Sequence, residues 1–165
     1  MVKAARHSAL ALGLCCVGLL SGCGFQPLYA GPGFSALPGL TIEAEDGRIG
    51  YLVEDALRDT LGSGRSPYHA VLETDFRESA IGLSATGRAR RFSGEIRVDY
   101  TLTGPDGFEH SGRVSEPVFY DAPSDPYSLI AARSAAEERA ADRVAEQLAQ
   151  EFATVLQRAA LGLEP

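Results

Sequence analysis

The stretch from Phe92 to Thr103 alternates apolar and polar side chains along its whole length. Such alternation is typical of a half-buried antiparallel strand with one face in water. One face carries Phe92, Gly94, Ile96, Val98, Tyr100 and Leu102, and the other carries Ser93, Glu95, Arg97, Asp99, Thr101 and Thr103. We therefore expect a sheet that buries Ile96 and Tyr100 beneath helices and leaves Arg97 and Asp99 exposed.

Strand patterns extend on both sides of this stretch, over residues 67–119. Before it, apolar positions alternate in two runs that are separated by a predicted turn or bulge at Glu78-Ser79. The runs are Tyr68, Ala70, Leu72, Thr74 and Phe76, and then Ile81, Leu83 and Ala85. After it, Gly104-Pro105-Asp106-Gly107 predicts a turn into a further strand over 108–119. Pro117 predicts an edge position or a bulge for that strand, because proline cannot donate a ladder hydrogen bond.

Two segments have the spacing of helices. The first has an apolar stripe made of Ile49, Leu52, Val53, Ala56, Leu57, Thr60 and Leu61, and Gly62-Ser63-Gly64 ends it. The second opens at Asp125-Pro126, an N-cap residue followed by proline at the first helical position, and has no breaker up to Ala160. It is roughly 50 Å long at about 1.5 Å per residue. A small sheet does not cover that length, so we expect an end that projects or frays.

The remaining regular segment is a short alternating strand at Leu40–Ala44. The chain thus reads as strand, helix, three or four antiparallel strands and a long helix. Helices on one face of an antiparallel sheet form a two-layer α+β sandwich. We predict a mostly antiparallel four-stranded sheet with two helices on one face, the C-terminal helix long.

The N-terminus has the pattern of a secretory signal. Lys3 and Arg6 precede an uncharged apolar run over residues 8–20, which is too short to span a membrane. The run ends in Leu20-Ser21-Gly22-Cys23, which resembles a bacterial lipobox. In such a signal the cysteine receives a diacylglycerol, the chain is cut before it, and its new amine is acylated. The alternative is a conventional cleavage site with Cys23 as an ordinary cysteine.

Processing at Cys23 would define three regions. These are a signal peptide at 1–22, an acylated cysteine with a Gly/Pro-rich tether at 23–39, and a single domain at 40–165. Formal net charge would change from −7 to −9, because Lys3 and Arg6 are lost. Such an acidic protein is a poor candidate for nucleic-acid binding. Cys15 and Cys16 would leave with the signal, so no thiol would remain for a disulfide or a metal.

Catalytic patterns are weak. Gly82-Leu83-Ser84-Ala85-Thr86-Gly87 differs from the hydrolase elbow by one position and lacks a strand-to-helix setting. His69 and His110 have no neighbouring ligand spacing, so we expect no catalytic site, no metal and no cofactor other than the lipid on Cys23. The acidic residues of the two helices, Glu54, Asp55, Glu137 and Glu138, are interpreted as lying on solvated faces.

The cluster Arg88, Arg90 and Arg91 stands out in this acidic chain. Arg88 and Arg90 share the parity of Phe92, whereas Arg91 points the other way. Three guanidinium groups at one sheet end can hold phosphates through bidentate hydrogen bonds. The alternative is a solvated hairpin end whose arginines pair with Glu73 or Asp75.

Residues 20–29, Leu-Ser-Gly-Cys-Gly-Phe-Gln-Pro-Leu-Tyr, closely resemble the start of the LptE family of outer-membrane lipopolysaccharide-assembly lipoproteins. The later order agrees: a helix after Arg48-Ile49-Gly50, the strands, Phe119-Tyr120-Asp121 before an Asp-Pro, and a long C-terminal helix. Gly24, where an aspartate would resemble an inner-membrane retention signal, agrees with outer-membrane sorting.

The resemblance implies a non-enzymatic protein of the Gram-negative outer membrane, anchored through Cys23 by lipid that includes palmitate. It implies that the chain plugs the LptD β-barrel, helps it assemble, and takes part in delivering lipopolysaccharide to the outer leaflet. It also implies lipopolysaccharide binding by basic residues at the sheet, to which Arg88, Arg90 and Arg91 correspond in kind. The alternative is a lipoprotein auxiliary subunit of a periplasmic or ABC-type transport system.

Overall fold

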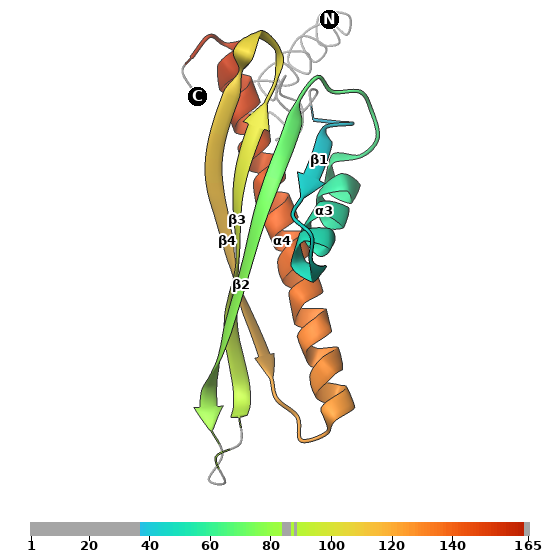
Figure 1. Cartoon of the computed structure of the whole chain (residues 1–165), viewed down its shortest axis with the longest axis vertical. Helices are drawn as coiled ribbons and strands as arrows, with labels where there is room; N and C mark the ends of the chain where they lie inside the picture. The colour runs from blue at the N-terminus through green and yellow to red at the C-terminus, as the bar shows by residue number, and fades with distance from the viewer. Residues whose placement is uncertain (1–36, 84–86, 88, 164–165) are drawn as a thin grey trace, which may run out of the picture. The chain divides into compact units, whose positions relative to one another are not determined.

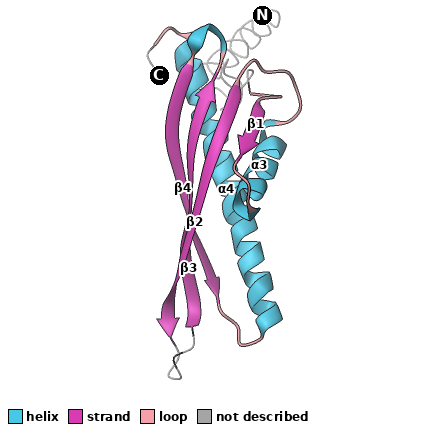
Figure 2. Cartoon of the chain, viewed as in Figure 1, coloured by secondary structure: helices cyan, strands magenta, loops and turns pink. Residues whose placement is uncertain are grey.

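The computed structural model describes residues 37–83, 87 and 89–163, which form one sheet and two α-helices (Figure 2). The elements are β1 (Thr41–Ala44), α3 (Arg48–Leu61), β2 (His69–Leu83), β3 (Ala89–Thr103), the 3-10 turn η1 (Pro105–Gly107), β4 (Glu109–Asp121) and α4 (Pro126–Ala160). Within these residues, no helix is long and apolar enough to cross a membrane.

The sheet has four strands in the order β1-β2-β3-β4 (Figure 1). β2, β3 and β4 pair antiparallel. β1 runs parallel to β2 and pairs only with residues 69–72, because α3 crosses over between the two strands. The predicted α+β class, with a mostly antiparallel sheet and a long C-terminal helix, is therefore confirmed.

The core lies between the sheet and the helices. Its largest fully buried side chains are Leu37, Val53, Leu57, Leu72, Ile96, Val98, Leu102, Val118, Val144, Leu148 and Phe152. The Tyr100 ring packs edge-on against Phe152, with centroids 5.0 Å apart and planes at 77°. Each large apolar side chain that is buried in this way contributes about 1.5–3 kcal/mol relative to an exposed one.

The predicted alternation of β3 is confirmed. Ile96 and Tyr100 are 0% and 2% exposed, and they face the helices. Arg97 and Asp99 lie on the opposite face, where their side chains are 36% and 42% exposed. This second face carries ion pairs that connect Arg97 with Glu95, Arg113 with Asp99, and Arg77 with Asp75.

The predicted turn at Glu78-Ser79 is wrong, because β2 continues through these residues. The register against β3 shifts later, between Ala80 and Leu83. A charged residue here interrupts the apolar parity, and the strand tolerates it because the Glu78 carboxylate has partners. It accepts a hydrogen bond from the Tyr120 hydroxyl at 2.7 Å and lies 3.2 Å from the Arg133 guanidinium.

The end of the chain follows the sequence expectations closely. β4 is an edge strand, which agrees with Pro117. The Asp125 carboxylate caps α4 by accepting the Ser128 backbone N–H at 2.8 Å. Buried side chains of α4 extend from Ala136 to Leu156, and none of residues 126–135 is buried. The weakly covered end of this helix is therefore its N-terminal end.

Candidate functional site

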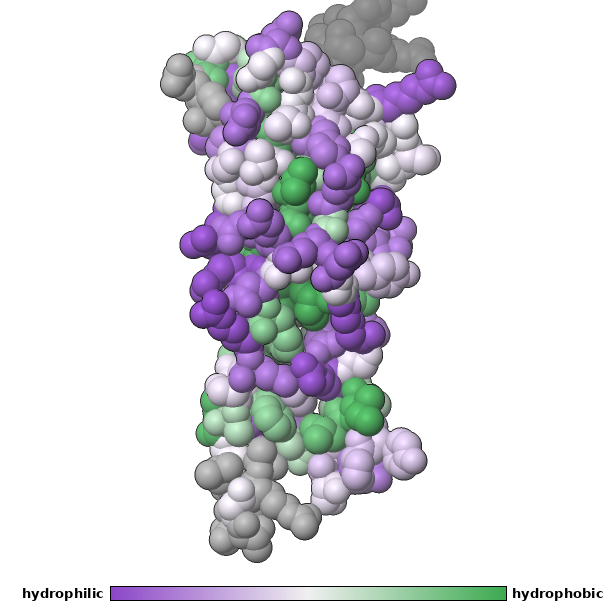
Figure 3. All heavy atoms as spheres, viewed as in Figure 1, coloured by the Kyte–Doolittle hydropathy of each residue, from purple (hydrophilic) through white to green (hydrophobic). Residues whose placement is uncertain are grey.

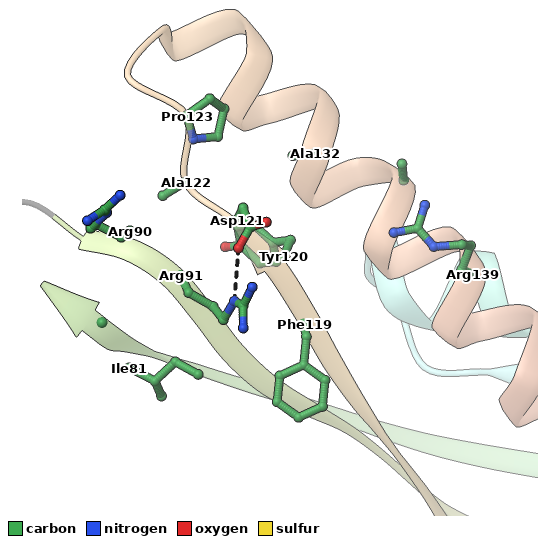
Figure 4. Close-up of a pocket in the computed structure, with 12 residues that line it drawn as sticks. Ile81, Arg90, Arg91, Phe119, Tyr120, Asp121, Ala122, Pro123, Ala132 and Arg139 are labelled. Atoms are coloured by element: carbon green, nitrogen blue, oxygen red, sulfur yellow. Dashed lines mark hydrogen bonds and ion pairs between the residues drawn. The ribbon is translucent and has the colours of Figure 1, made fainter. Parts of the chain in front are cut away.

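An open hollow of about 1020 Å³ lies at the sheet end that carries the β2–β3 connection, and residues of β2, β3, β4 and α4 line it (Figure 4). Its cationic side chains are Arg90 and Arg91 of β3 and Arg139 of α4. Its other lining residues include Ile81, Phe119, Tyr120, Ala132 and Ala135. The hollow thus combines positive charge with apolar surface.

The pairing of β3 with β4 fixes the position of Arg91. Arg91 lies directly opposite Asp121, and its Nε donates to the Asp121 carboxylate at 2.9 Å. The two side chains are 58% and 74% exposed, so the pair adds little stability and is open to exchange with a dissolved anion. Arg90 and Arg139 are also exposed, and no ion pair joins either of them to an acid within the described residues.

Tyr120 forms the buried part of the hollow's lining. Its ring stacks on Phe92, with centroids 5.1 Å apart and planes at 17°. Burial, and secondarily the hydrogen bond to Glu78, raise the pKa of Tyr120 to about 12. The phenol is protonated at neutral pH, so the charged groups of the lining are the three arginines and the Asp121 carboxylate that pairs with Arg91.

Exposed apolar side chains gather at this end of the domain (Figure 3). Ile81 and Phe119 are 55% and 57% exposed in the lining of the hollow. Tyr127 and Ile130, on the first turns of α4, are 84% and 67% exposed. Exposed apolar groups that lie together mark a binding surface more often than scattered ones do. Beside guanidinium groups, they suit an anion that also has an apolar part.

The structure bears on part of the predicted arginine cluster. Arg90 and Arg91 line one hollow, whereas Arg88 and the predicted lipidation site Cys23 lie outside the described residues. The alternative pairing partners do not engage these two arginines in the described part of the chain. Asp75 pairs with Arg77 instead, and Arg91 pairs with Asp121.

Sequence reasoning missed three members of the lining. Arg139 belongs to α4, which begins many residues after β3, and nothing in the local sequence indicates that it lines the same hollow as Arg90 and Arg91. Phe119 and Ile81 did carry a signal. Phe119 is an apolar side chain on the polar parity of β4, which is the pattern that an exposed contact residue produces.

Sequence reasoning was also wrong about Glu137, which is not on a solvated face. Its side chain is 4% exposed, and its carboxylate accepts from Arg48 Nε and from Arg133 Nε, each at 2.8 Å. Arg48 is the first residue of α3 and lies 89 positions earlier in the chain. The burial of Glu137 therefore depends on tertiary contacts that the helical pattern does not show.

The chemistry available at the hollow is binding chemistry. A guanidinium offers paired N–H donors that match two oxygens of a phosphate. No group of three His, Cys, Asp or Glu side chains in the described ranges is arranged to hold a metal ion. The fold and the hollow together define a small α+β domain with a cationic and apolar binding surface.

Comparison with known proteins identifies the family. The model of the LptE family, described as lipopolysaccharide-assembly, matches residues 37–156, and the chain belongs to this family. A candidate lipoprotein from Caulobacter crescentus CB15 is 32% identical, with a TM-score of 0.63, over 75% of this chain and 94% of that one. A minor lipoprotein from Acinetobacter baumannii shares the fold at 12% identity, with a TM-score of 0.51, over 70% and 90%. A comparison with curated proteins finds no significant match.

Proposed function

We propose that this chain is a non-enzymatic outer-membrane lipoprotein that plugs the LptD β-barrel, helps it assemble, and takes part in delivering lipopolysaccharide to the outer leaflet. Membership of a lipopolysaccharide-assembly family supports this function. The observation that carries the lipid-binding part is the hollow, in which Arg90, Arg91 and Arg139 stand beside exposed apolar side chains.

Lipopolysaccharide has the two properties that the hollow suits. Its lipid A carries phosphates, which guanidinium groups bind through parallel hydrogen bonds, and acyl chains, which suit exposed apolar groups. The protein is acidic overall, so a negatively charged lipid needs a local reversal of charge in order to bind. Arg90, Arg91 and Arg139 supply this reversal, and we extend the site to Arg88 on the basis of the sequence alone.

Anchoring is the second part of the proposal. Cys23 would carry the diacylglycerol and the N-acyl chain, because it follows a lipobox-like Leu20-Ser21-Gly22. The similar proteins from Caulobacter and Acinetobacter are both described as lipoproteins, which agrees with an anchor. A single acyl chain holds a protein only marginally, whereas two or three chains hold it firmly at the membrane.

The alternative function is that of an auxiliary subunit of a periplasmic or ABC-type transport system. The two functions differ in the partner, so affinity purification of the tagged chain from detergent-solubilised outer membrane separates them. A large β-barrel in the eluate supports the LptD partner. An ABC-type complex would replace the proposal by the alternative.

Lipopolysaccharide binding is tested by replacing Arg90, Arg91 and Arg139 together with serine in the full protein in mild detergent. We expect capture of purified lipopolysaccharide to weaken, and the residual binding to depend less on salt, because exposed charges are screened over about 8 Å at physiological ionic strength. Circular dichroism and barrel co-purification should be unchanged, since exposed charges add little to stability.

The matched control replaces Arg77, Arg97 and Arg113 with serine. It removes three positive charges from outside the hollow, on the solvent-exposed face of the sheet, where each arginine has an acidic partner. We expect this variant to bind lipopolysaccharide as the wild type does. Equal losses in both variants would show a general charge effect, and no loss in either would leave the protein without a lipopolysaccharide site at the hollow.

A further inference from the structure

A continuous chain of polar contacts connects the hollow to α3. From the Tyr120 hydroxyl it passes to Glu78 at 2.7 Å, and from there to Arg133 at 3.2 Å. Arg133 Nε then donates to Glu137 at 2.8 Å, and Arg48 Nε donates to the other oxygen of Glu137 at 2.8 Å. We call these five residues the polar chain. It joins β2, β4, α3 and α4.

Glu137 accepts hydrogen bonds from two members of the polar chain, and it is the one charged residue among the described positions that is buried in the domain. A buried carboxylate is costly unless it is paired and hydrogen-bonded, and here a guanidinium from each of two helices contacts it. Removing one partner of such a group is strongly destabilising, whereas a buried ion pair as a whole adds little net stability. The role of Glu137 is therefore better explained by the arrangement of the helices and the sheet that it fixes than by net stability.

Apolar packing holds the N-terminal part of α4 only weakly. Six of its twelve buried side chains are alanines, which interdigitate little with their neighbours. Its first ten residues, 126–135, contain no buried side chain. Leu129 and Ala132 only partly pack on the core. Two polar contacts connect this segment with other elements: Arg133 pairs with Glu78 of β2, and the Ser134 hydroxyl accepts from Arg48 of α3 at 2.6 Å. Glu137, one turn further along α4, accepts hydrogen bonds from both of these arginines.

This same segment forms one wall of the hollow. Ala132 and Ala135 line it, and Arg139 follows one turn later on the same stripe of α4. The opposite wall contains Tyr120, at the other end of the polar chain. The polar chain therefore spans the two walls between which a ligand of the hollow would lie.

We propose that Glu137 is a positioning residue, which holds residues 126–135 of α4 against the sheet and α3 and so keeps the two walls of the hollow at their distance. It acts through Arg133 and Arg48 and does not itself touch the ligand. That the hollow binds lipopolysaccharide rests on the proposed function, whereas the attachment of the α4 segment does not depend on it.

The first test is hydrogen exchange of the full protein in mild detergent, resolved along α4. In Glu137→Gln, exchange over residues 126–135 should accelerate about tenfold, because a buried charge-assisted hydrogen bond is lost. Residues 144–156 should exchange as in the wild type. Arg133→Gln should have the same local effect, and it serves as the second variant if Glu137→Gln folds poorly. Glu146→Gln removes the same charge from an exposed side chain of α4 outside the polar chain and should change nothing.

The second test is capture of purified lipopolysaccharide, with Val155→Ala as a control that loosens the other half of α4. Glu137→Gln should bind several-fold less lipopolysaccharide than the wild type. Val155→Ala should bind normally even if its melting temperature falls as much as that of Glu137→Gln. Unchanged exchange over 126–135, or faster exchange along the whole helix, would overturn the proposal. So would normal capture by Glu137→Gln under conditions in which Arg139→Ser loses it. If Arg139→Ser also binds normally, the lipopolysaccharide function fails, and the exchange pattern alone decides the role of Glu137.

Discussion

Gly112 of β4 lies directly opposite Tyr100 of β3, and the Tyr100 ring fills the space that a side chain at position 112 would occupy. A Cβ at position 112 would stand 2.6 Å from Tyr100 Cζ. The ring cannot move aside easily, because it is 2% exposed and packs on Phe152 of α4. Its hydroxyl reaches the Glu151 carboxylate at 3.4 Å, and burial together with that carboxylate raises the pKa of Tyr100 to about 12.

Gly112→Ala should therefore destabilise the domain. The methyl group forces the ring or the edge strand to shift, and overpacking of this kind costs about 1–3 kcal/mol. Denaturant unfolding monitored by circular dichroism measures the loss. The matched control is Gly82→Ala in β2, where the nearest atoms to an added Cβ are 4.0 Å away. A loss of equal size in both variants would mean that the close approach to Tyr100 has no special cost.

The alternation of buried and exposed side chains along β3 leads to a second prediction. Ile96→Ala removes a fully buried side chain and should cost about 2–5 kcal/mol as a core truncation. Arg97→Ala should be nearly silent, because its exposed ion pair with Glu95 contributes little. Melting temperatures of the two variants are the measurement. Similar shifts for both would show that the two faces of the strand do not differ in burial as described.

Most of the architecture was accessible from sequence because its signals are local. The alternation in β3, the glycines after α3 and the Asp125 cap each lie within a few residues of what they specify. The parallel orientation of β1 could not be predicted from local sequence, because it depends on which edge of β2 is free to pair once α3 has packed on the sheet. The arginines of β3 were identified by their density, but the hollow itself depends on how β3, β4 and α4 come together.

Glu137 shows the same limit most clearly. On a helical wheel it looks like any other acidic residue of an Ala-rich helix. Its burial requires Arg48, which begins a different helix, and Arg133, which precedes it by one turn. Glu138 beside it remains 56% exposed, so a shift of one position separates a solvated carboxylate from a buried one.

The lipid anchor provides a third prediction. Cys23→Ala should abolish incorporation of labelled palmitate, because in a lipobox the cysteine supplies the thiol that is modified first and, after cleavage, the amine that is acylated. The protein should then be lost from washed membranes, or should keep its signal peptide. Cys16→Ala, which alters a cysteine within the apolar run, is the control and should be labelled normally. Palmitate incorporation that persists in Cys23→Ala would remove the lipobox interpretation.

The last prediction concerns pH and the start of α4. The Asp125 carboxylate accepts hydrogen bonds from the backbone N–H and the hydroxyl of Ser128, each at 2.8 Å. The backbone hydrogen bond, followed by that of the hydroxyl, lowers the pKa of Asp125 below its ordinary value of 3.8. Because the folded state favours the ionised form, the stability that Asp125 contributes is fully present above the unfolded pKa. It is lost as pH falls through the lower, folded pKa.

Asp125→Asn keeps a capping oxygen but removes the charge that favours a helix N-terminus. The variant should therefore melt below the wild type at pH 7, and the difference should shrink as pH falls below about 4 and through the lower, folded pKa of Asp125. Melting temperatures measured across this range for both proteins are the test. Asp55→Asn removes the same charge from an exposed position in the middle of α3 and controls for net charge. If the Asp125→Asn difference stays constant down to pH 2, the charge of the cap does not contribute to the stability of α4.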